Sequence, residues 1–256
     1  MAMTLSFHEN IDYDETAKSF ELVPAMSNYP AVTDEKIHLF ADKMRIPRFY
    51  EHISRPRLIE LLKKSSRQFG ATLITGRAET GKTALAAELA EDYRRVAWYQ
   101  IDAAETDWSL FARYFAAMFD EDFEDYKFLN HEIFVFIEKL FLNVAQKKDG
   151  PILIVLDDVH NVFDADWFAE FFVSLLYTLT SDMHLVLLSR SKPPQPLWRV
   201  RSKQVLGVID EKLLAFNLDE AIEFVKKSGI SEKKAANAYK KSFGRISRIK
   251  QYIVMP

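Results

Sequence analysis

The chain has 256 residues, enough for one large α/β domain with a small appendage. Its formal net charge of −3 gives no global electrostatic reason to expect nucleic-acid binding, and the absence of cysteine excludes disulfides and cysteine-based zinc sites. No run approaches the roughly 20 apolar residues of a membrane span, and the first residues lack a signal-peptide pattern. We therefore expect a cytoplasmic protein with no membrane partner.

Residues 1–45 differ in composition from the rest of the chain. The part through Glu21 is polar and acidic with weak periodicity, whereas residues 33–44 have the apolar spacing of one amphipathic helix. We expect residues 1–45 to form an N-terminal arm that is partly disordered or packs on the main domain.

A regular alternation of elements begins at Ile46. Short apolar runs predict five strands, at 71–75, 96–101, 152–156, 185–188 and 204–209. Helical periodicity and caps predict the helices, at 57–69, 82–94, 107–119, 132–147, 164–179 and 217–227, with one more after Ser231. Strands that are apolar throughout are typical of a parallel sheet buried on both faces. The sequence thus predicts an α/β fold over 46–216, with a five-stranded, mostly parallel sheet between helices, and a small helical subdomain over 217–256.

The first motif with chemistry is Gly-x-x-x-x-Gly-Lys-Thr at 76–83, between a predicted strand and a predicted helix. This is the pattern of a P-loop, in which backbone N–H groups and the positive end of a helix surround the phosphates of a nucleotide. We expect Lys82 to reach the terminal phosphates and the Thr83 hydroxyl to bind Mg²⁺. The residues predicted to contact the nucleotide are Gly76, Arg77, Ala78, Glu79, Thr80, Gly81, Lys82, Thr83 and Ala84.

Two carboxylates, Asp157 and Asp158, end the apolar run at 152–156. Desolvated acids are costly, and a divalent cation removes that difficulty. Asp157 is therefore predicted to hold Mg²⁺, directly or through water, and Asp158 to orient or activate the water that attacks the γ-phosphate. The plainer alternative is a solvated strand end with no chemical role.

Ser189 and Arg190 end the run at 185–188. If this strand lies between the P-loop strand and the strand that ends in the two acids, both side chains face the γ-phosphate. Arg190 would then sense that phosphate through a charge-assisted contact. The alternative is a surface arginine at the start of a loop. Lys82, Asp158 and Arg190 are thus the predicted catalytic residues.

These motifs, in this order, resemble the nucleotide-binding module of STAND-class signal-transduction ATPases, and in particular that of large LuxR-type transcriptional activators of the maltose-regulator type. The residues that carry the resemblance are Arg55-Pro56-Arg57-Leu58, the P-loop, Ala97-Trp98-Tyr99, Leu156-Asp157-Asp158-Val159-His160, Leu188-Ser189-Arg190 and Leu214-Ala215-Phe216. The resemblance implies a P-loop NTPase fold that binds ATP or ADP with Mg²⁺. It also implies that the adenine lies near the segment before Arg57. We therefore add Arg57 to the predicted nucleotide-binding residues.

The resemblance further implies a mode of action. Proteins of this kind hydrolyse ATP slowly and switch between an ADP-bound resting state and an ATP-bound state that self-associates. Their Gly-x-Pro motif in the small helical domain corresponds here to Gly244-Arg245-Ile246, where the proline is missing. They also carry further domains that do not fit after Pro256, so we expect either a fragment of a larger regulator or a short stand-alone version.

The leading hypothesis is therefore a weak ATPase whose nucleotide state controls assembly in signal transduction or transcription regulation. A second hypothesis is a P-loop kinase or another phosphotransferase acting on a small substrate, although the sequence has no clear arginine-rich lid. A third is a protein that holds nucleotide without hydrolysing it. Direct DNA binding by the helices of 231–252 is a fourth, and the acidic net charge disfavours it.

Overall fold

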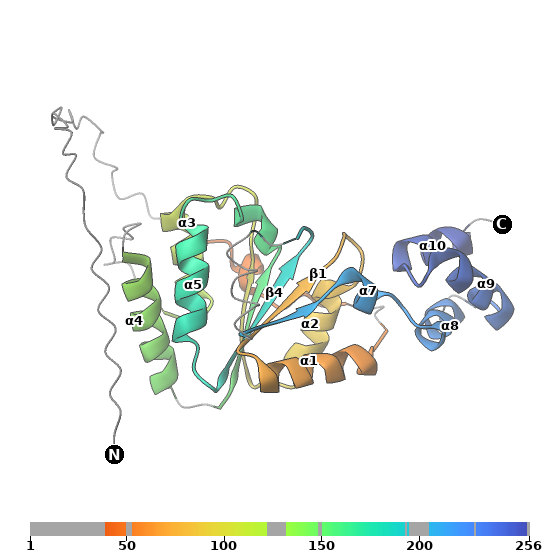
Figure 1. Cartoon of the computed structure of the whole chain (residues 1–256), viewed down its shortest axis with the longest axis horizontal. Helices are drawn as coiled ribbons and strands as arrows, with labels where there is room; N and C mark the ends of the chain where they lie inside the picture. Colours follow the sequence, from red (N-terminus) through yellow and green to blue (C-terminus); the bar gives the residue numbers. More distant parts are fainter. Residues whose placement is uncertain are drawn as a thin grey trace, which may run out of the picture. The chain divides into compact units, whose positions relative to one another are not determined.

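The computed structural model describes residues 39–49, 53–121, 132–147, 150–192, 194, 205–227 and 229–254. Figure 1 shows a central sheet with helices on both sides, followed by a group of helices near the C-terminus. None of the described helices is long and apolar enough to cross a membrane. The expectations for residues 1–38 lie outside the described residues.

A five-stranded sheet forms the centre of the fold. Its strands are β1 (Ala71–Thr75), β2 (Arg95–Gln100), β3 (Ile152–Asp157), β4 (Met183–Ser189) and β5 (Leu206–Ile209). They lie in the order β2-β3-β4-β1-β5, and every neighbouring pair is parallel. The predicted α/β fold is confirmed, and the sheet is parallel throughout rather than mostly parallel. Because the strands are parallel, their carboxyl ends all meet at one edge.

Helices cover both faces of the sheet. On one face lie α1 (Pro56–Gln68) and α2 (Lys82–Ala90). On the other lie α3 (Trp108–Ala117), α4 (Ile133–Gln146) and α5 (Phe168–Thr178). Successive side chains of a strand point to opposite faces, so neighbours such as Leu73 and Ile74 in β1 belong to two different hydrophobic cores. This burial on both faces is why the strands read as uninterrupted apolar runs.

Three further helices pack together near the C-terminus. They are α8 (Leu218–Lys226), α9 (Glu232–Ser242) and α10 (Ile246–Val254), and the short helix α7 (Glu211–Leu214) connects β5 to them. They enclose a separate small core that includes Val225 and Ile249. A capping box starts α8, because Asn217 accepts from the N–H of Glu220 and the Glu220 carboxylate accepts from the N–H of Asn217. The domain boundaries at 45/46 and 216/217 remain predictions.

Gly244 ties the turn between α9 and α10 to the chain before α8. Its φ is +73°, and a Cβ at this position would lie 2.2 Å from the carbonyl oxygen of Phe216. The N–H of Phe216 donates to the carbonyl of Gly244 at 2.8 Å. Only glycine tolerates both the positive φ and this close approach of backbone.

The described chain begins with a 3-10 turn, η1 (Ala41–Met44), where the sequence predicts the end of a longer amphipathic helix. The N–H of Phe40 donates to the Tyr114 hydroxyl at 3.1 Å, and Lys43 forms an ion pair with the buried carboxylate of Glu105. These contacts with α3 and the loop before it hold the backbone in place. Tertiary contacts of this kind commonly override local helix propensity.

Candidate functional site

The three predicted motifs meet at the carboxyl edge of the sheet. β4 lies between β1 and β3, as the interpretation of Ser189 and Arg190 requires. Thr75 pairs with Ser189 across β1 and β4, and the N–H of Gly76 donates to the carbonyl of Ser189 at 3.1 Å. The P-loop after β1, the acids at the end of β3 and Arg190 after β4 are therefore neighbours in space, although they are far apart in the sequence.

The P-loop backbone is tightly curled between β1 and α2. Glu79 and Gly81 both take positive φ, at 62° and 83°. The ammonium of Lys82 donates to the carbonyls of Gly76 at 2.7 Å and Arg77 at 2.8 Å. The curl and the N-terminus of α2 thus bring together N–H groups and a positive charge that suit an anion.

Lys82 is buried, and burial lowers its pKa. The nearby carboxylates of Asp158 and Asp157 oppose that shift, whereas Arg190 adds to it. The lysine is thus surrounded by charges of both signs that converge from three strands. An additional anion would stabilise its charged form.

Asp157 is the last residue of β3 and is only 3% exposed. Its Oδ1 accepts the N–H of Asp158 at 2.9 Å, and its carboxylate also accepts a hydrogen bond from Thr83. Burial and the charge of Asp158 raise the pKa of Asp157 to about 6, while the hydrogen bond from Thr83 opposes the shift. A buried carboxylate beside a hydroxyl is a set of oxygen donors that suits Mg²⁺, and a cation there would offset both causes of the shift.

Asp158 has a φ of 56°, an uncommon left-handed conformation for a residue with a side chain. Arg190 binds both of its oxygens, with Nε 3.1 Å from Oδ1 and Nη2 2.9 Å from Oδ2. His160 follows in the 3-10 helix η3 (Val159–Val162), with Nδ1 3.8 Å from Oδ1 of Asp158, and burial lowers its pKa. Arg190, the predicted phosphate sensor, thus binds Asp158, the predicted base. A γ-phosphate and Asp158 would therefore compete for the guanidinium of Arg190.

A mostly apolar cavity of about 220 Å³ lies next to the P-loop. Its lining includes Ile53, Arg55, Gly81, Leu85, Phe216 and Ile246. Two of these residues belong to the segment before Arg57, where the family resemblance locates the adenine. Ile246 occupies the position of the missing proline, and its Cδ1 lies 3.6 Å from where a Cβ on Gly81 would be. The substitution therefore leaves an apolar side chain against the P-loop.

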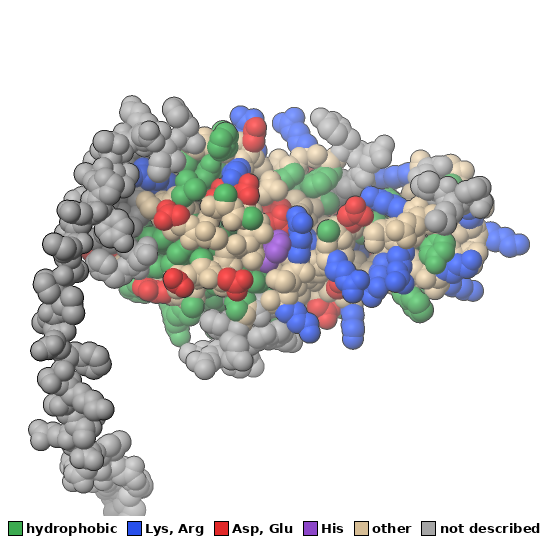
Figure 2. Space-filling model, turned by 90° about the horizontal axis from the view of Figure 1, so that it is seen from above, with side chains coloured by type: hydrophobic (Ala, Val, Ile, Leu, Met, Phe, Trp, Pro, Cys, Tyr) green, Lys and Arg blue, Asp and Glu red, His purple; other side chains and the backbone are tan. Residues whose placement is uncertain are grey.

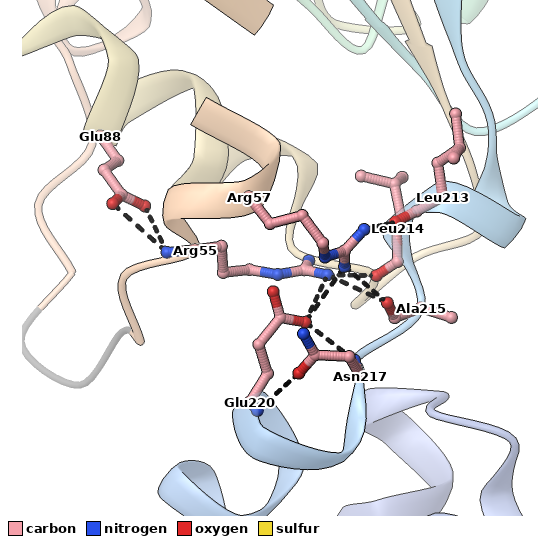
Figure 3. A network of polar contacts seen from close by, with 8 residues as sticks. All are labelled: Arg55, Arg57, Glu88, Leu213, Leu214, Ala215, Asn217 and Glu220. Atoms are coloured by element: carbon pink, nitrogen blue, oxygen red, sulfur yellow. Dashed lines mark hydrogen bonds and ion pairs between the residues drawn. The ribbon is translucent and has the colours of Figure 1, made fainter. Parts of the chain in front are cut away.

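Two arginines at the start of α1 bind one carboxylate of α8, as Figure 3 shows. The Nη2 atoms of Arg55 and Arg57 lie 3.4 Å and 3.1 Å from Oε2 of Glu220. Arg55 also donates to the carbonyl of Leu214 at 2.6 Å, and Arg57 to that of Ala215 at 3.1 Å. The described contacts of Arg57, which the sequence predicts as a nucleotide ligand, are thus with the carbonyls of Leu213 and Ala215 and with Glu220.

Arg55 is 4% exposed, and burial lowers its pKa. Its guanidinium lies 4.8 Å from the centre of the Phe216 ring and borders the apolar cavity. Among the described residues, its Nε and Nη1 have no hydrogen-bond partner. Buried polar groups are nearly always hydrogen-bonded, so these two donors mark the cavity as a place for an acceptor.

Glu211, the first residue of α7, connects the P-loop to the turn before α10. Its Oε2 accepts the N–H of Arg77 at 3.4 Å and lies 3.6 Å from Nε of the same residue. Its Oε1 lies 3.8 Å from Nε of Arg245. One carboxylate thus faces an arginine of the nucleotide loop and an arginine of the Gly-Arg-Ile motif.

The sequence did not single out Glu211 and Glu220 as residues of this site. Glu220 is visible in the sequence only as part of an acidic first turn of a helix, which is a common local feature. Its pairing with Arg55 and Arg57 depends on how the last helices pack on the sheet domain. No local pattern carries that information.

Comparisons with known proteins agree with this geometry. Residues 65–191 match the AAA domain family. The chain is similar to the HTH-type transcriptional regulator MalT of Vibrio cholerae, with 29% identity over 185 residues that cover 69% of this chain and 20% of that protein. It is 28% identical to MalT of Yersinia enterocolitica over 196 residues, which cover 73% of this chain and 21% of that protein. The chain thus spans about a fifth of the length of these relatives.

Two solved structures have a similar fold. One is a signal transduction ATPase with numerous domains (STAND) and a tetratricopeptide repeat sensor from Pyrococcus horikoshii, with a TM-score of 0.59 and 21% identity, covering 82% of this chain and 30% of that one. The other is a Walker-type ATPase of Pyrococcus abyssi, with a TM-score of 0.50 and 14% identity, covering 78% of this chain and 65% of that one. The P-loop NTPase fold inferred from the motifs is confirmed.

Proposed function

We propose that this chain, a P-loop ATPase module that resembles those of MalT-type transcription regulators and STAND ATPases, is a nucleotide-controlled switch. It binds ATP with Mg²⁺, hydrolyses it slowly to ADP and phosphate, and self-associates in its ATP-bound state. The observation that carries the proposal is the convergence of Lys82, Asp157 and Arg190 at the carboxyl edge of three adjacent strands. A role in the regulation of transcription is likewise proposed, because the chain spans about a fifth of the length of its MalT relatives.

The P-loop supports the binding of a triphosphate. Its backbone from Gly76 to Ala84 offers N–H donors, and Lys82 offers a positive charge. In binding, Lys82 would exchange its contacts with the carbonyls of Gly76 and Arg77 for phosphate oxygens. A hydrogen bond between two charged groups is about twice as strong as one to a neutral carbonyl, so the exchange favours the nucleotide.

Thr83 and Asp157 are the proposed magnesium ligands. The buried carboxylate of Asp157 and the hydroxyl that donates to it already lie together. Mg²⁺, when bound, would supply the positive charge that stabilises the terminal phosphate oxygens. Since Asp157 has a pKa raised to about 6, its carboxylate is ionised and able to bind the metal at neutral pH.

The apolar cavity next to the P-loop is the proposed base site. Phe216 and Ile246 offer apolar walls for the faces of a purine ring. The two unpartnered donors of Arg55 offer hydrogen bonds to acceptors at the ring edge. Arg57 contributes indirectly in this proposal, since its described contacts hold Glu220 and the chain around Ala215.

Asp158 is the proposed base for the attacking water. Arg190 holds both of its oxygens, so Asp158 becomes free to accept a proton only when Arg190 turns toward the γ-phosphate. Binding of the third phosphate and activation of the water are thereby coupled through one guanidinium. This requirement for an exchange of partners supports slow turnover.

The C-terminal helices are the proposed moving part. Glu220 ties α8 to Arg55 and Arg57, and Glu211 lies between Arg77 of the P-loop and Arg245 before α10. A triphosphate adds negative charge next to Arg77 and competes with Glu211 for it. The binding energy of the γ-phosphate would thereby change the position of these helices and expose a surface for a second copy.

The first experiment measures ATP and ADP affinity with and without Mg²⁺. We expect Lys82→Ala to abolish affinity for the phosphates and Asp158→Asn to slow hydrolysis by about 10²-fold or more while ATP stays bound. Lys64→Ala, which removes an exposed lysine of α1, is the matched control and should change neither quantity. The nucleotide-site proposal fails if ATP and ADP do not bind to the unmodified chain.

Self-association is tested separately by light scattering. The mass in solution should rise with a non-hydrolysable ATP analogue and stay lower with ADP. Equal masses in both states would refute the switch while leaving nucleotide binding intact.

A phosphotransferase is the second candidate. A polar cavity of about 310 Å³, lined by residues such as Lys43, Asp102 and Asn161, lies beside Asp158 and would hold a small acceptor. Multiple turnover faster than about 1 s⁻¹ with a small acceptor would favour this function, because kinases typically run at ~1–100 s⁻¹. Slow release of inorganic phosphate with water as the acceptor would favour the switch.

A further inference from the structure

The last two helices carry a charge unlike that of the whole chain. Residues 229–254 contain seven lysines and arginines and one glutamate, a net charge of +6. The whole chain has a net charge of −3, so the other residues together carry −9. The acidic net charge of the whole chain therefore conceals a strongly basic segment at these helices.

Most of these cations point into solvent. The exposed ones are Lys233, Lys234, Lys240, Lys241, Arg248 and Lys250. Arg248 and Lys250 line the cavities beside the P-loop, so we call only the four lysines of α9 the basic face. On α9 the buried residues are Ala235, Ala238 and Ser242, whose spacing defines the opposite side of the helix. Figure 2 shows Lys and Arg side chains gathered over the end of the molecule that carries these helices, with acidic side chains more frequent toward the other end.

The charges of the basic face are largely uncompensated. The ion pairs found near it join Lys226 to Glu232 at 2.5 Å and Arg245 to Glu211 at 3.8 Å. Within the described part of the chain, no ion pair engages Lys233, Lys234 or Lys240. Like charges held this close together repel one another, and a polyanion relieves that repulsion.

Aromatic side chains lie among these cations. Phe243, in the turn between α9 and α10, is 79% exposed and has a φ of 55°. Tyr252 is 37% exposed, and the ammonium of Lys241 lies 5.7 Å from the centre of its ring. A large aromatic in a left-handed conformation is uncommon, and one that is also exposed contributes little to the core. Exposed rings between cations are the features on which unpaired bases stack.

We propose that the basic face and Phe243 bind single-stranded nucleic acid. The four lysines of the basic face contact phosphates of the strand, and Phe243 stacks on one unpaired base. Reading of duplex DNA by the start of α10 does not fit the fold, because Arg245 and Ile246 face the P-loop and Glu211. An anionic membrane fits less well, since Phe243 and Tyr252 are the only large apolar side chains exposed on the described parts of α9, α10 and the turn between them.

The test measures the binding of a fluorescent oligothymidylate to the full chain. Fluorescence anisotropy gives the association constant at a series of salt concentrations. If four phosphates are contacted, the logarithm of the association constant should fall with the logarithm of salt with a slope of about −3. Lys240→Ala with Lys241→Ala should make this slope shallower by about one. Lys63→Ala with Lys64→Ala removes the same charge from α1 and should leave the slope unchanged.

The contribution of the ring is tested with Phe243→Asn. Asparagine tolerates positive φ, so this change removes the ring without straining the turn. We expect the affinity for the oligothymidylate to fall by about tenfold, while the affinity for a duplex of equal length, which offers no unpaired base, stays the same. Urea denaturation verifies that each variant is folded.

Lys82→Ala separates this site from the P-loop. The proposal predicts that this variant binds the oligothymidylate as well as the unmodified chain does. It is overturned if the oligothymidylate does not bind at low salt, if Lys82→Ala abolishes its binding, or if the α1 double variant weakens it as much as the α9 one. It is also overturned if Phe243→Asn has no effect on the single strand, or if phosphatidylserine vesicles bind and the oligothymidylate does not.

Discussion

Glu220 is the residue whose replacement tests most directly how the C-terminal helices are held. Its carboxylate is shared by Arg55 and Arg57 and also accepts the N–H of Asn217 at 3.0 Å. In Glu220→Gln the amide oxygen can still accept from Asn217, so the capping box survives. The change therefore removes the negative charge and little else.

The magnitude is set by burial. Glu220 is 7% exposed and Arg55 is 4% exposed, so both charges lie out of water. Removing one partner of a buried ion pair typically costs about 3–5 kcal/mol. Arg55 keeps its 2.6 Å bond to the carbonyl of Leu214, and the Arg57 side chain is 36% exposed, so solvent and backbone recover part of that loss. We expect Glu220→Gln to lower the free energy of unfolding by about 2–3 kcal/mol.

The assay is urea denaturation, monitored by tryptophan fluorescence and by circular dichroism. Trp98, Trp108 and Trp167 are buried in the two cores of the sheet domain, so their fluorescence reports on that domain. Far-ultraviolet circular dichroism reports on all helices, including α8 to α10. If Glu220 holds these helices to the sheet domain, the midpoint of the dichroism transition should fall by about 1 M urea, given m-values of ~1–3 kcal/mol per M.

Glu223→Gln is the matched control, because Glu223 lies on the same helix and is exposed. It should change the free energy of unfolding by no more than about 0.5 kcal/mol. Equal midpoints for Glu220→Gln and Glu223→Gln would refute a stabilising role of the shared carboxylate. Arg55→Gln should reproduce the loss, and the two replacements combined should cost less than their sum, because each removes the same interaction.

Two further predictions concern buried ionisable groups. Asp157→Asn should raise the free energy of unfolding at neutral pH by up to about 3 kcal/mol, because the pKa of Asp157 is raised to about 6 in the folded chain. Burial penalises the ionised carboxylate, so the unmodified chain loses this stability as pH rises from 3.8 through 6. Equal urea midpoints for Asp157→Asn and the unmodified chain at neutral pH would contradict the prediction. The same variant should lose the Mg²⁺-dependent part of its ATP affinity. His184 is the opposite case, since burial lowers its pKa from 6.5 to about 4. Its contribution to stability is complete above pH 6.5 and is lost as pH falls toward 4, by at most about 3 kcal/mol. His184→Gln should therefore flatten the dependence of the urea midpoint on pH over that window, and a dependence as steep as in the unmodified chain would contradict the assignment.

Much of the site could be predicted because its parts are local. The P-loop pattern requires a strand before it and a helix after it, and β1 and α2 are found there. The acids Asp157 and Asp158 end a strand, as their position after an apolar run predicts. In each case the residues that specify the feature are neighbours in the sequence.

Other features of the site could not be predicted with the same detail. The sequence predicts that Arg190 senses the γ-phosphate, but not that it binds both oxygens of Asp158 in the described fold. The sequence also does not predict that Glu220 binds two arginines of the sheet domain, or that Glu211 lies between the P-loop and the turn before α10. These are contacts between residues far apart in the chain, and many surface acids would satisfy the same local pattern.

The sequence by itself determined the kind of fold and the chemistry at its edge, because runs of apolar residues and the P-loop pattern are written in consecutive positions. The tertiary structure decided which strands are neighbours, and so brought Arg190 to Asp158 between β1 and β3. It also decided that the last helices lie where Glu220 meets Arg55 and where Ile246 borders the P-loop. The physical reason is that strand order and helix packing minimise the free energy of the whole chain, through burial and pairing of groups that no short segment contains.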